Sequence, residues 1–274
     1  MKARIIVAVI AVPVLFVILF FLKPVFLAVL TALICGCAAF EFTRAVCPET
    51  NIRIKCYAIV SAVLIPFAML GSAPFAVTRG IAAVFLLAVF CEGIWSYGKK
   101  NDISFEHILC CAFAGVIYPI MMSSLVSLKV MDNGKFFVLL PVVVTFCCDS
   151  GAYFAGVFFG KHKITPHVSP NKSAEGFIGG IVCGVLCMVI YGAVVALSTK
   201  LKVNFAVLIL YGVIGSAAVE LGDLTYSLIK REHGVKDYGN LIPGHGGVLD
   251  RFDSMSFSAP VICALAAILP VFAG

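Results

Sequence analysis

The chain has 274 residues, of which 62% are hydrophobic and only 12% are charged, with a mean hydropathy of +1.09. Soluble domains carry about 25% charged residues, so this composition excludes a soluble globular protein. It predicts an all-α, polytopic integral membrane protein built as a bundle of transmembrane helices. The formal net charge of +6 is modest, and no regular spread of basic and aromatic residues indicates a nucleic-acid surface, so we expect no nucleic-acid partner.

Apolar segments of roughly membrane-spanning length follow one another along the whole chain. We interpret the first as a membrane helix rather than a signal peptide, because Lys23 and Pro24 follow it without a small-residue cleavage site. We expect one integrated membrane unit, in which residues 1–135 form N-terminal helices and residues 136–274 form the catalytic region. The nine predicted membrane segments are 5–22, 25–42, 57–77, 81–97, 108–128, 136–159, 177–197, 205–229 and 255–272.

The basic residues are distributed unevenly between the loops that these nine segments would connect. With a cytoplasmic N-terminus, 14 of the 20 Lys and Arg residues lie on the cytoplasmic side and 6 on the other side. The positive-inside rule therefore predicts a cytoplasmic N-terminus. Both strongly polar loops, residues 160–176 and 230–253, would then face the cytoplasm, where nucleotides are found. The sequence thus predicts a multi-pass protein of the inner (cytoplasmic) membrane with its site on the cytoplasmic face.

The most polar stretch of the chain, residues 227–253, reads SLIKREHGVKDYGNLIPGHGGVLDRFD. Its basic side chains are of the kind that binds phosphates. Its carboxylates, next to such cations, indicate a magnesium ion on nucleotide phosphates. Its glycines let backbone N–H groups approach an anion closely. The alternative interpretation is a solvated, charge-balanced loop between two membrane helices.

Five carboxylates fall inside predicted membrane segments. Glu41 and Glu92 match no motif and stay unassigned, whereas Asp149, Glu220 and Asp223 lie close to the two polar loops. Ionisable groups are costly there and usually functional, although pairing with a lysine from another helix would be a purely structural explanation. On a helix, Asp223, Ser227 and Lys230 stand at positions i, i+4 and i+7 and so share one face. This face leads from the membrane segment into the polar stretch, so ligands for a metal and for phosphates could converge there.

The spacing within residues 227–253 resembles the signature of the phosphatidate cytidylyltransferases, or CDP-diacylglycerol synthases. That signature is a Ser, then Lys-Arg, then Lys-Asp, a small residue, Pro-x-His-Gly-Gly and Asp-Arg-x-Asp. The resemblance covers roughly residues 149–254, and the first half of the chain matches only in hydropathy. The matching residues are Ser227, Lys230, Arg231, Lys236, Asp237, Gly239, Pro243, His245, Gly246, Gly247, Val248, Asp250, Arg251 and Asp253.

The resemblance implies a nucleotidyltransferase that makes CDP-diacylglycerol and pyrophosphate from CTP and phosphatidate. It implies magnesium, alone or with a monovalent cation such as K⁺, with Asp223 and Asp250 as ligands. His245 is expected to contact a phosphate or shape the loop, because the attacking lipid phosphate is already anionic and needs no base. The other catalytic residues implied are Lys230, Arg231, Lys236 and Asp237. The substrate-binding residues implied are Asp149, Lys172, Ser227, Gly246, Gly247, Arg251 and Asp253.

Two other functions are compatible with parts of the sequence. One is a different CTP-using membrane lipid enzyme, either another lipid cytidylyltransferase or a prenyl alcohol kinase. The other is a transporter with an intramembrane cation site, although the dense phosphate-binding pattern does not favour it and no inverted repeat is visible. The expected partners are CTP, phosphatidate and membrane lipids, and the sequence leaves a homodimer open.

Overall fold

The structure is a computed structural model that describes residues 13–99, 102–241 and 246–273. Within these residues it is helical except for loops and one short antiparallel strand pair, β1 (Lys202–Val203) with β2 (Phe272–Ala273). Seven helices of this part of the chain are long and apolar enough to cross a membrane. The prediction of an all-α polytopic membrane protein is therefore confirmed, while the number of nine spans and the side of the N-terminus stay predictions.

The chain forms two compact units. The first contains residues 1–130 and 232–252, and the second contains residues 131–231 and 253–274. The polar stretch singled out in the sequence is therefore divided between them: residues 227–231 and 253 belong to the second unit, and residues 232–252 belong to the first.

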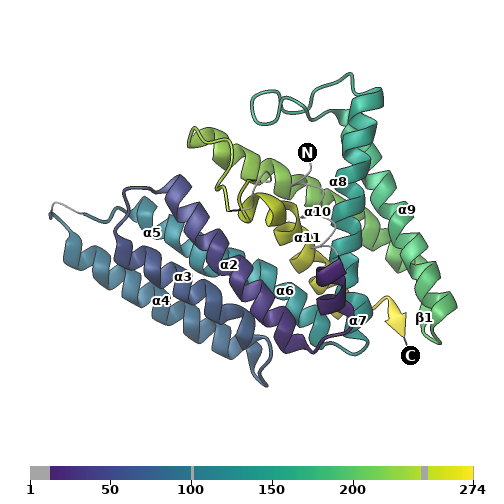
Figure 1. Ribbon diagram of the computed structural model, residues 1–274, viewed down its shortest axis with the longest axis horizontal. Helices are drawn as coiled ribbons and strands as arrows, with labels where there is room; N and C mark the ends of the chain where they lie inside the picture. The colour runs from purple at the N-terminus through teal and green to yellow at the C-terminus, as the bar shows by residue number, and fades with distance from the viewer. Residues whose placement is uncertain (1–12, 100–101, 242–245, 274) are drawn as a thin grey trace. The chain divides into compact units, whose positions relative to one another are not determined.

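The first unit is built from helices that pack around α3 (Ile52–Ala68). This helix lies beside α2 and α4 (Figure 1). It also contacts the π-helical turn η1, which lies between α5 and α6 in the chain. Gly115 of η1 allows this contact, because a Cβ there would lie 2.8 Å from Ala58 Cα. The other elements are α2 (Pro24–Val46), α4 (Pro74–Ser96), α5 (Phe105–Ala112), η1 (Phe113–Ile117) and α6 (Tyr118–Val130).

The end of α3 differs from the sequence prediction of a segment at 57–77. The helix ends at Ala68, and α4 begins at Pro74 rather than at residue 81. Proline is favoured in the first turn of a helix, where no N–H is needed, so Pro74 fixes the new start. Because the intervening turn is itself mostly apolar, hydropathy alone merged it with the preceding helix.

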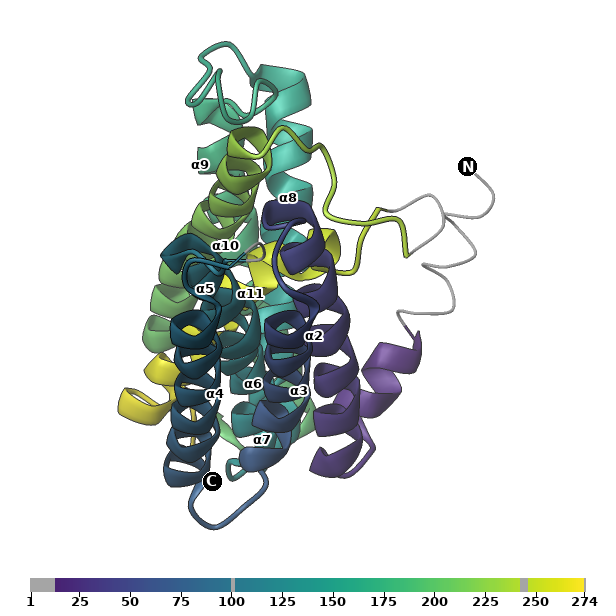
Figure 2. The same ribbon diagram turned by 90° about the vertical axis from the view of Figure 1, so that its left-hand side faces the viewer.

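In the second unit, α8 (Leu139–Phe159) and α9 (Ala174–Ser198) pack closely along their lengths (Figure 2). Glycines make this approach possible. A Cβ on Gly151 would lie 2.3 Å from Cys183 Cβ, and one on Gly179 would lie 2.3 Å from Ala155 Cβ. Small residues at such positions let membrane helices pack backbone to backbone. The unit also contains α7 (Gly134–Phe137), α10 (Phe205–Glu232) and most of α11 (Leu249–Ile268).

The loop of residues 160–173 that joins α8 to α9 is ordered by hydrogen bonds at the start of α9. Glu175 accepts from the backbone N–H groups of Lys161 and His162, at 3.0 and 3.2 Å, and lies 2.6 Å from His162 Nδ1. Ser173 caps the helix, because its hydroxyl accepts from Gly176 N–H at 3.1 Å. These contacts fix the backbone next to Lys172, the basic residue that the resemblance assigns to phosphate binding.

Candidate active site

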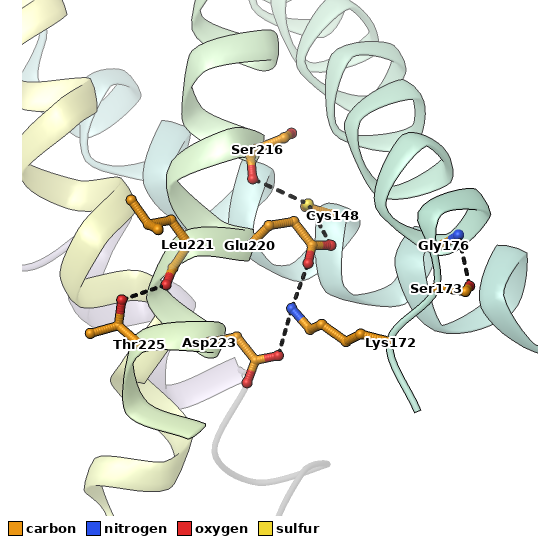
Figure 3. Close-up of polar contacts among 9 residues, drawn as sticks. All are labelled: Cys148, Lys172, Ser173, Gly176, Ser216, Glu220, Leu221, Asp223 and Thr225. Atoms are coloured by element: carbon orange, nitrogen blue, oxygen red, sulfur yellow. Dashed lines mark hydrogen bonds and ion pairs between the residues drawn. The ribbon is translucent and has the colours of Figure 1, made fainter. Parts of the chain in front are cut away.

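Lys172 lies between two carboxylates of α10 (Figure 3). Its Nζ is 2.5 Å from Glu220 Oε2 and 2.7 Å from Asp223 Oδ2. Glu220 and Asp223 are three residues apart on α10, so they lie on one face of the helix. The side chain of Glu220 is 2% exposed and that of Lys172 is 19% exposed, whereas that of Asp223 is 34% exposed. Solvent is therefore excluded from the cluster at Glu220 but reaches it at Asp223.

The charge of Lys172 is stabilised by this arrangement. Burial acts to lower the pKa of Lys172, but the charges of Asp223 and Glu220, and its hydrogen bonds to them, outweigh burial and raise the pKa above its ordinary value. The ammonium group is therefore fully charged at neutral pH.

More acidic and polar groups surround this lysine in the second unit. Cys148 of α8 lies 3.9 Å from Glu220 through its Sγ atom and donates to the Ser216 carbonyl at 3.7 Å. Asp149, next in the chain, is exposed and lies within electrostatic range of the cluster and of Asp253. The second unit thus gathers Asp149, Lys172, Asp223 and Asp253, four of the residues expected in the site.

The last turns of α10 carry three more residues of the signature. Ser227, Lys230 and Arg231 all lie within this one continuous helix, which ends at Glu232. The expected shared face of Asp223, Ser227 and Lys230 is therefore present. Arg231 is exposed, and its Nε donates to the Val168 carbonyl at 3.3 Å. This bond connects the end of α10 to the loop that carries Lys172.

The glycine turn of the signature, of which Gly246 and Gly247 are described, lies in the first unit next to Asp250. Asp250 Oδ2 accepts from Tyr238 N–H at 2.9 Å and from Gly247 N–H at 3.1 Å. Gly246 has φ +85°, a left-handed conformation that favours glycine. A Cβ on Gly246 would lie 3.4 Å from Asp250 Oδ2 and 3.6 Å from Asp237 Oδ1, so both carboxylates flank this glycine.

Glu41 of α2 contacts this turn, and the sequence analysis assigned it no role. It is fully buried, and its two oxygens accept from Val248 N–H at 3.1 Å and from Leu249 N–H at 2.9 Å. Gly239 and Gly247 allow its approach, since a Cβ on either would lie 2.3 or 2.6 Å from a Glu41 oxygen. The signal that could have found it is a carboxylate inside the apolar segment 25–42.

These bonds also explain why α11 begins earlier than expected. The sequence predicted a membrane segment from residue 255, but the helix starts at Leu249. Glu41 satisfies two of the backbone N–H groups that a helix start leaves without partners. Asp250, Arg251 and Asp253 therefore stand on the first turns of a helix rather than in a loop.

The expected site residues thus form two groups, one in each unit. The first unit holds Lys236, Asp237, Gly246, Gly247, Asp250 and Arg251, and the second holds Asp149, Lys172, Asp223, Ser227, Lys230, Arg231 and Asp253. Lys236, Asp237 and Arg251 are exposed, whereas Gly247 is buried. His245 lies outside the described residues.

The carboxylates fit the needs of a magnesium ion. No group of three His, Cys, Asp or Glu side chains that could hold a metal is present among the described residues. Magnesium does not need one, because it keeps several waters and binds through one or two carboxylates and the substrate phosphates. Asp223 offers a partly exposed carboxylate, one oxygen of which, Oδ2, binds Lys172. Oxygen ligands of this kind suit a hard cation.

Comparison with known proteins identifies the family. A model of the cytidylyltransferase family matches residues 2–269 of the chain. The chain belongs to the cytidylyltransferase family. Cytidylyltransferases are nucleotidyltransferases, so the enzyme class and the family expected from the signature are confirmed.

Individual relatives agree with this assignment. The phosphatidate cytidylyltransferase of Bacillus subtilis is 35% identical over 184 residues, which are 67% of either chain. That of Staphylococcus aureus is 37% identical over 170 residues, 60% of this chain and 61% of the relative. That of Haemophilus influenzae is 45% identical over 131 residues, 47% of this chain and 44% of the relative. The matches thus span from under half to two thirds of the relatives' length.

Proposed function

We propose that this protein is a CTP:phosphatidate cytidylyltransferase, which makes CDP-diacylglycerol and pyrophosphate. The observation that carries the proposal is the complete signature from Ser227 to Asp253, in a chain of the cytidylyltransferase family. One substrate and one product of this reaction are lipids. The seven membrane-length helices of the described chain support such a substrate.

The reaction needs positioning and charge more than covalent chemistry. An oxygen of the phosphatidate phosphate attacks the α-phosphorus of CTP, and the bond from that phosphorus to the bridging oxygen of the β-phosphate breaks. Pyrophosphate leaves with this electron pair, so no covalent enzyme intermediate is required. Lys172, Lys230, Arg231 and Lys236 would hold phosphate oxygens, and the charge of Lys172 is secured by its two carboxylate neighbours.

Asp223 and Asp250 would bind magnesium, alone or with a monovalent cation. Magnesium would neutralise charge on the nucleotide phosphates. Asp223 is suited to this role because its carboxylate is the accessible member of the Lys172 cluster. Asp250 is suited because its side chain is held by the backbone of the glycine turn.

The site faces the cytoplasm of the cell in this proposal. The excess of Lys and Arg on the loops around residues 160–176 and 230–253 supports this side. In a cysteine-free variant, single cysteines at Thr165 and Asn240 should react with membrane-impermeant reagents from the cytoplasmic side only. Labelling of the two positions from opposite sides would refute this topology.

The activity is tested with purified protein, labelled CTP, phosphatidate and magnesium. The expected product is a labelled CDP-lipid, with release of pyrophosphate that depends on the lipid and stops with EDTA. Asp223→Asn should lose nearly all turnover, because the amide keeps the size but removes the charge that holds the cation. Intact CTP in this assay, with a solute crossing liposome membranes instead, would show that the protein is a transporter.

A further inference from the structure

The buried carboxylate of Glu41 lies at the start of the helix that carries Asp250. It accepts hydrogen bonds from the N–H of Leu249, the first residue of α11, and from that of Val248 just before it. No ion pair of Glu41 is present among the described Lys, Arg and His side chains. The N-terminus of a helix carries a partial positive charge and attracts anions. The Glu41 side chain is therefore held by backbone N–H groups of the signature itself.

Glu41 and Asp250 act on the same turn from two sides. Between them they accept four backbone N–H groups, those of residues 238, 247, 248 and 249. Phe42, next to Glu41, contributes as well, because its ring stacks on that of Tyr238 with the centroids 5.8 Å apart. The backbone at Tyr238 and at residues 247–249 is thereby tied to two carboxylates, and this holds the direction of the Asp250 side chain.

The glycines of the turn leave room for the Glu41 carboxylate. The three atoms that a Cβ on Gly239 would meet first all belong to Glu41: Oε1 at 2.3 Å, Cδ at 2.6 Å and Cγ at 2.9 Å. Gly239 stands at the small-residue position of the signature. A larger side chain at this position would overlap the Glu41 side chain on α2.

We infer that Glu41 is a positioning residue of the reaction: it fixes the glycine turn and the first turn of α11, and thereby the direction in which Asp250 presents its carboxylate. The inference rests on the proposed function, since Asp250 is placed there as a magnesium ligand. Glu41 itself touches backbone and not substrate. It acts through Asp250 in the way that outer groups orient the ligands of metal sites.

The first measurement is hydrogen exchange without magnesium or CTP, comparing the wild type with Glu41→Gln and Glu92→Gln. Glu92 is the matched control, since this carboxylate of α4 pairs with Arg53 at 3.5 Å and accepts from Tyr57 at 3.2 Å. Glutamine at position 41 has the size of glutamate, but its amide NH2 group replaces one of the two accepting oxygens. One backbone N–H would then face another donor and lose its hydrogen bond. Exchange at the amides of Val248 and Leu249 should therefore accelerate in Glu41→Gln and stay unchanged in Glu92→Gln.

The second measurement is the magnesium dependence of CDP-lipid formation per folded molecule. For Glu41→Gln, the magnesium concentration that gives half-maximal activity should rise about tenfold or more. Excess magnesium should restore part of the lost kcat, whereas Glu92→Gln should match the wild type. A purely structural role would lower the yield of folded protein and leave the magnesium dependence unchanged, which would overturn the inference.

A double-mutant comparison covers the case in which one variant does not fold well. Gly239→Ala should be damaging in the wild type, because its Cβ collides with Glu41, and much less damaging beside Glu41→Ala, where the space is vacant. Equal damage in both backgrounds would contradict the assigned contact. If the wild type makes no CDP-lipid, the proposed function fails, while the exchange result still decides whether Glu41 holds the turn.

Discussion

Replacing Lys172 by methionine would leave Glu220 buried without its cation. Glu220 is 2% exposed, so water cannot replace the lost partner. Removing one partner of a buried ion pair leaves an uncompensated charge, which costs about 3–5 kcal/mol. Asp223 is 34% exposed and stays hydrated, so its loss of the same partner adds at most about 1 kcal/mol.

The deficit comes from one uncompensated buried charge, so removing that charge as well should relieve it. Lys172→Met/Glu220→Gln has no buried carboxylate left at this position and should show a smaller deficit of about 1–2 kcal/mol. In the wild type, the contribution of Lys172 stays present until the pH rises through its raised pKa, above the ordinary lysine range.

The free energies of unfolding can be measured by SDS titration in mixed micelles, followed by far-UV circular dichroism at pH 7. We expect Lys172→Met to lose about 3–5 kcal/mol and the double variant to lose clearly less. A deficit of Lys172→Met under about 1 kcal/mol would refute the reasoning, since that is the behaviour of an exposed ion pair.

Two further substitutions test the packing that holds the Lys172 loop. Ser173→Ala removes the hydroxyl that accepts from Gly176 N–H and should lower stability by about 1 kcal/mol, measured as a lower Tm. Gly179→Ala places a Cβ 2.3 Å from Ala155 Cβ and should cost about 3 kcal/mol. Gly156→Ala is the control, because its Cβ meets nothing closer than 3.5 Å, and it should keep or slightly raise the Tm. Equal losses for the two glycine variants would contradict the helix contact.

The parts of the fold that could be predicted from sequence are those set by local composition. Long apolar runs gave the helices, and one continuous helix through residue 232 gave the common face of Asp223, Ser227 and Lys230. The early start of α11 could not be predicted, because the group that satisfies its first N–H groups stands 208 residues away in the sequence, on α2. Local cap signals are read from neighbouring residues and cannot reveal a cap of this kind.

The intramembrane carboxylates show a second limit of the sequence. Function and pairing with a lysine were both open for Asp223, and the structure shows that it does pair with Lys172. This pairing does not decide between the two interpretations, since the lysine is itself a candidate phosphate ligand. Glu220 was visible as a buried acid, but only the geometry shows that it shares the same lysine.

The bonds between Glu41 and the start of α11 have a consequence for how the protein is made. The carboxylate enters the membrane with the first helices, whereas its partners Val248 and Leu249 are synthesised more than two hundred residues later. Until these residues have been synthesised, the Glu41 carboxylate lacks its two backbone donors. The turn that carries Asp250 can reach its final form only after nearly the whole chain has been inserted, so a stalled or truncated product would retain most of the signature without the support that orders it.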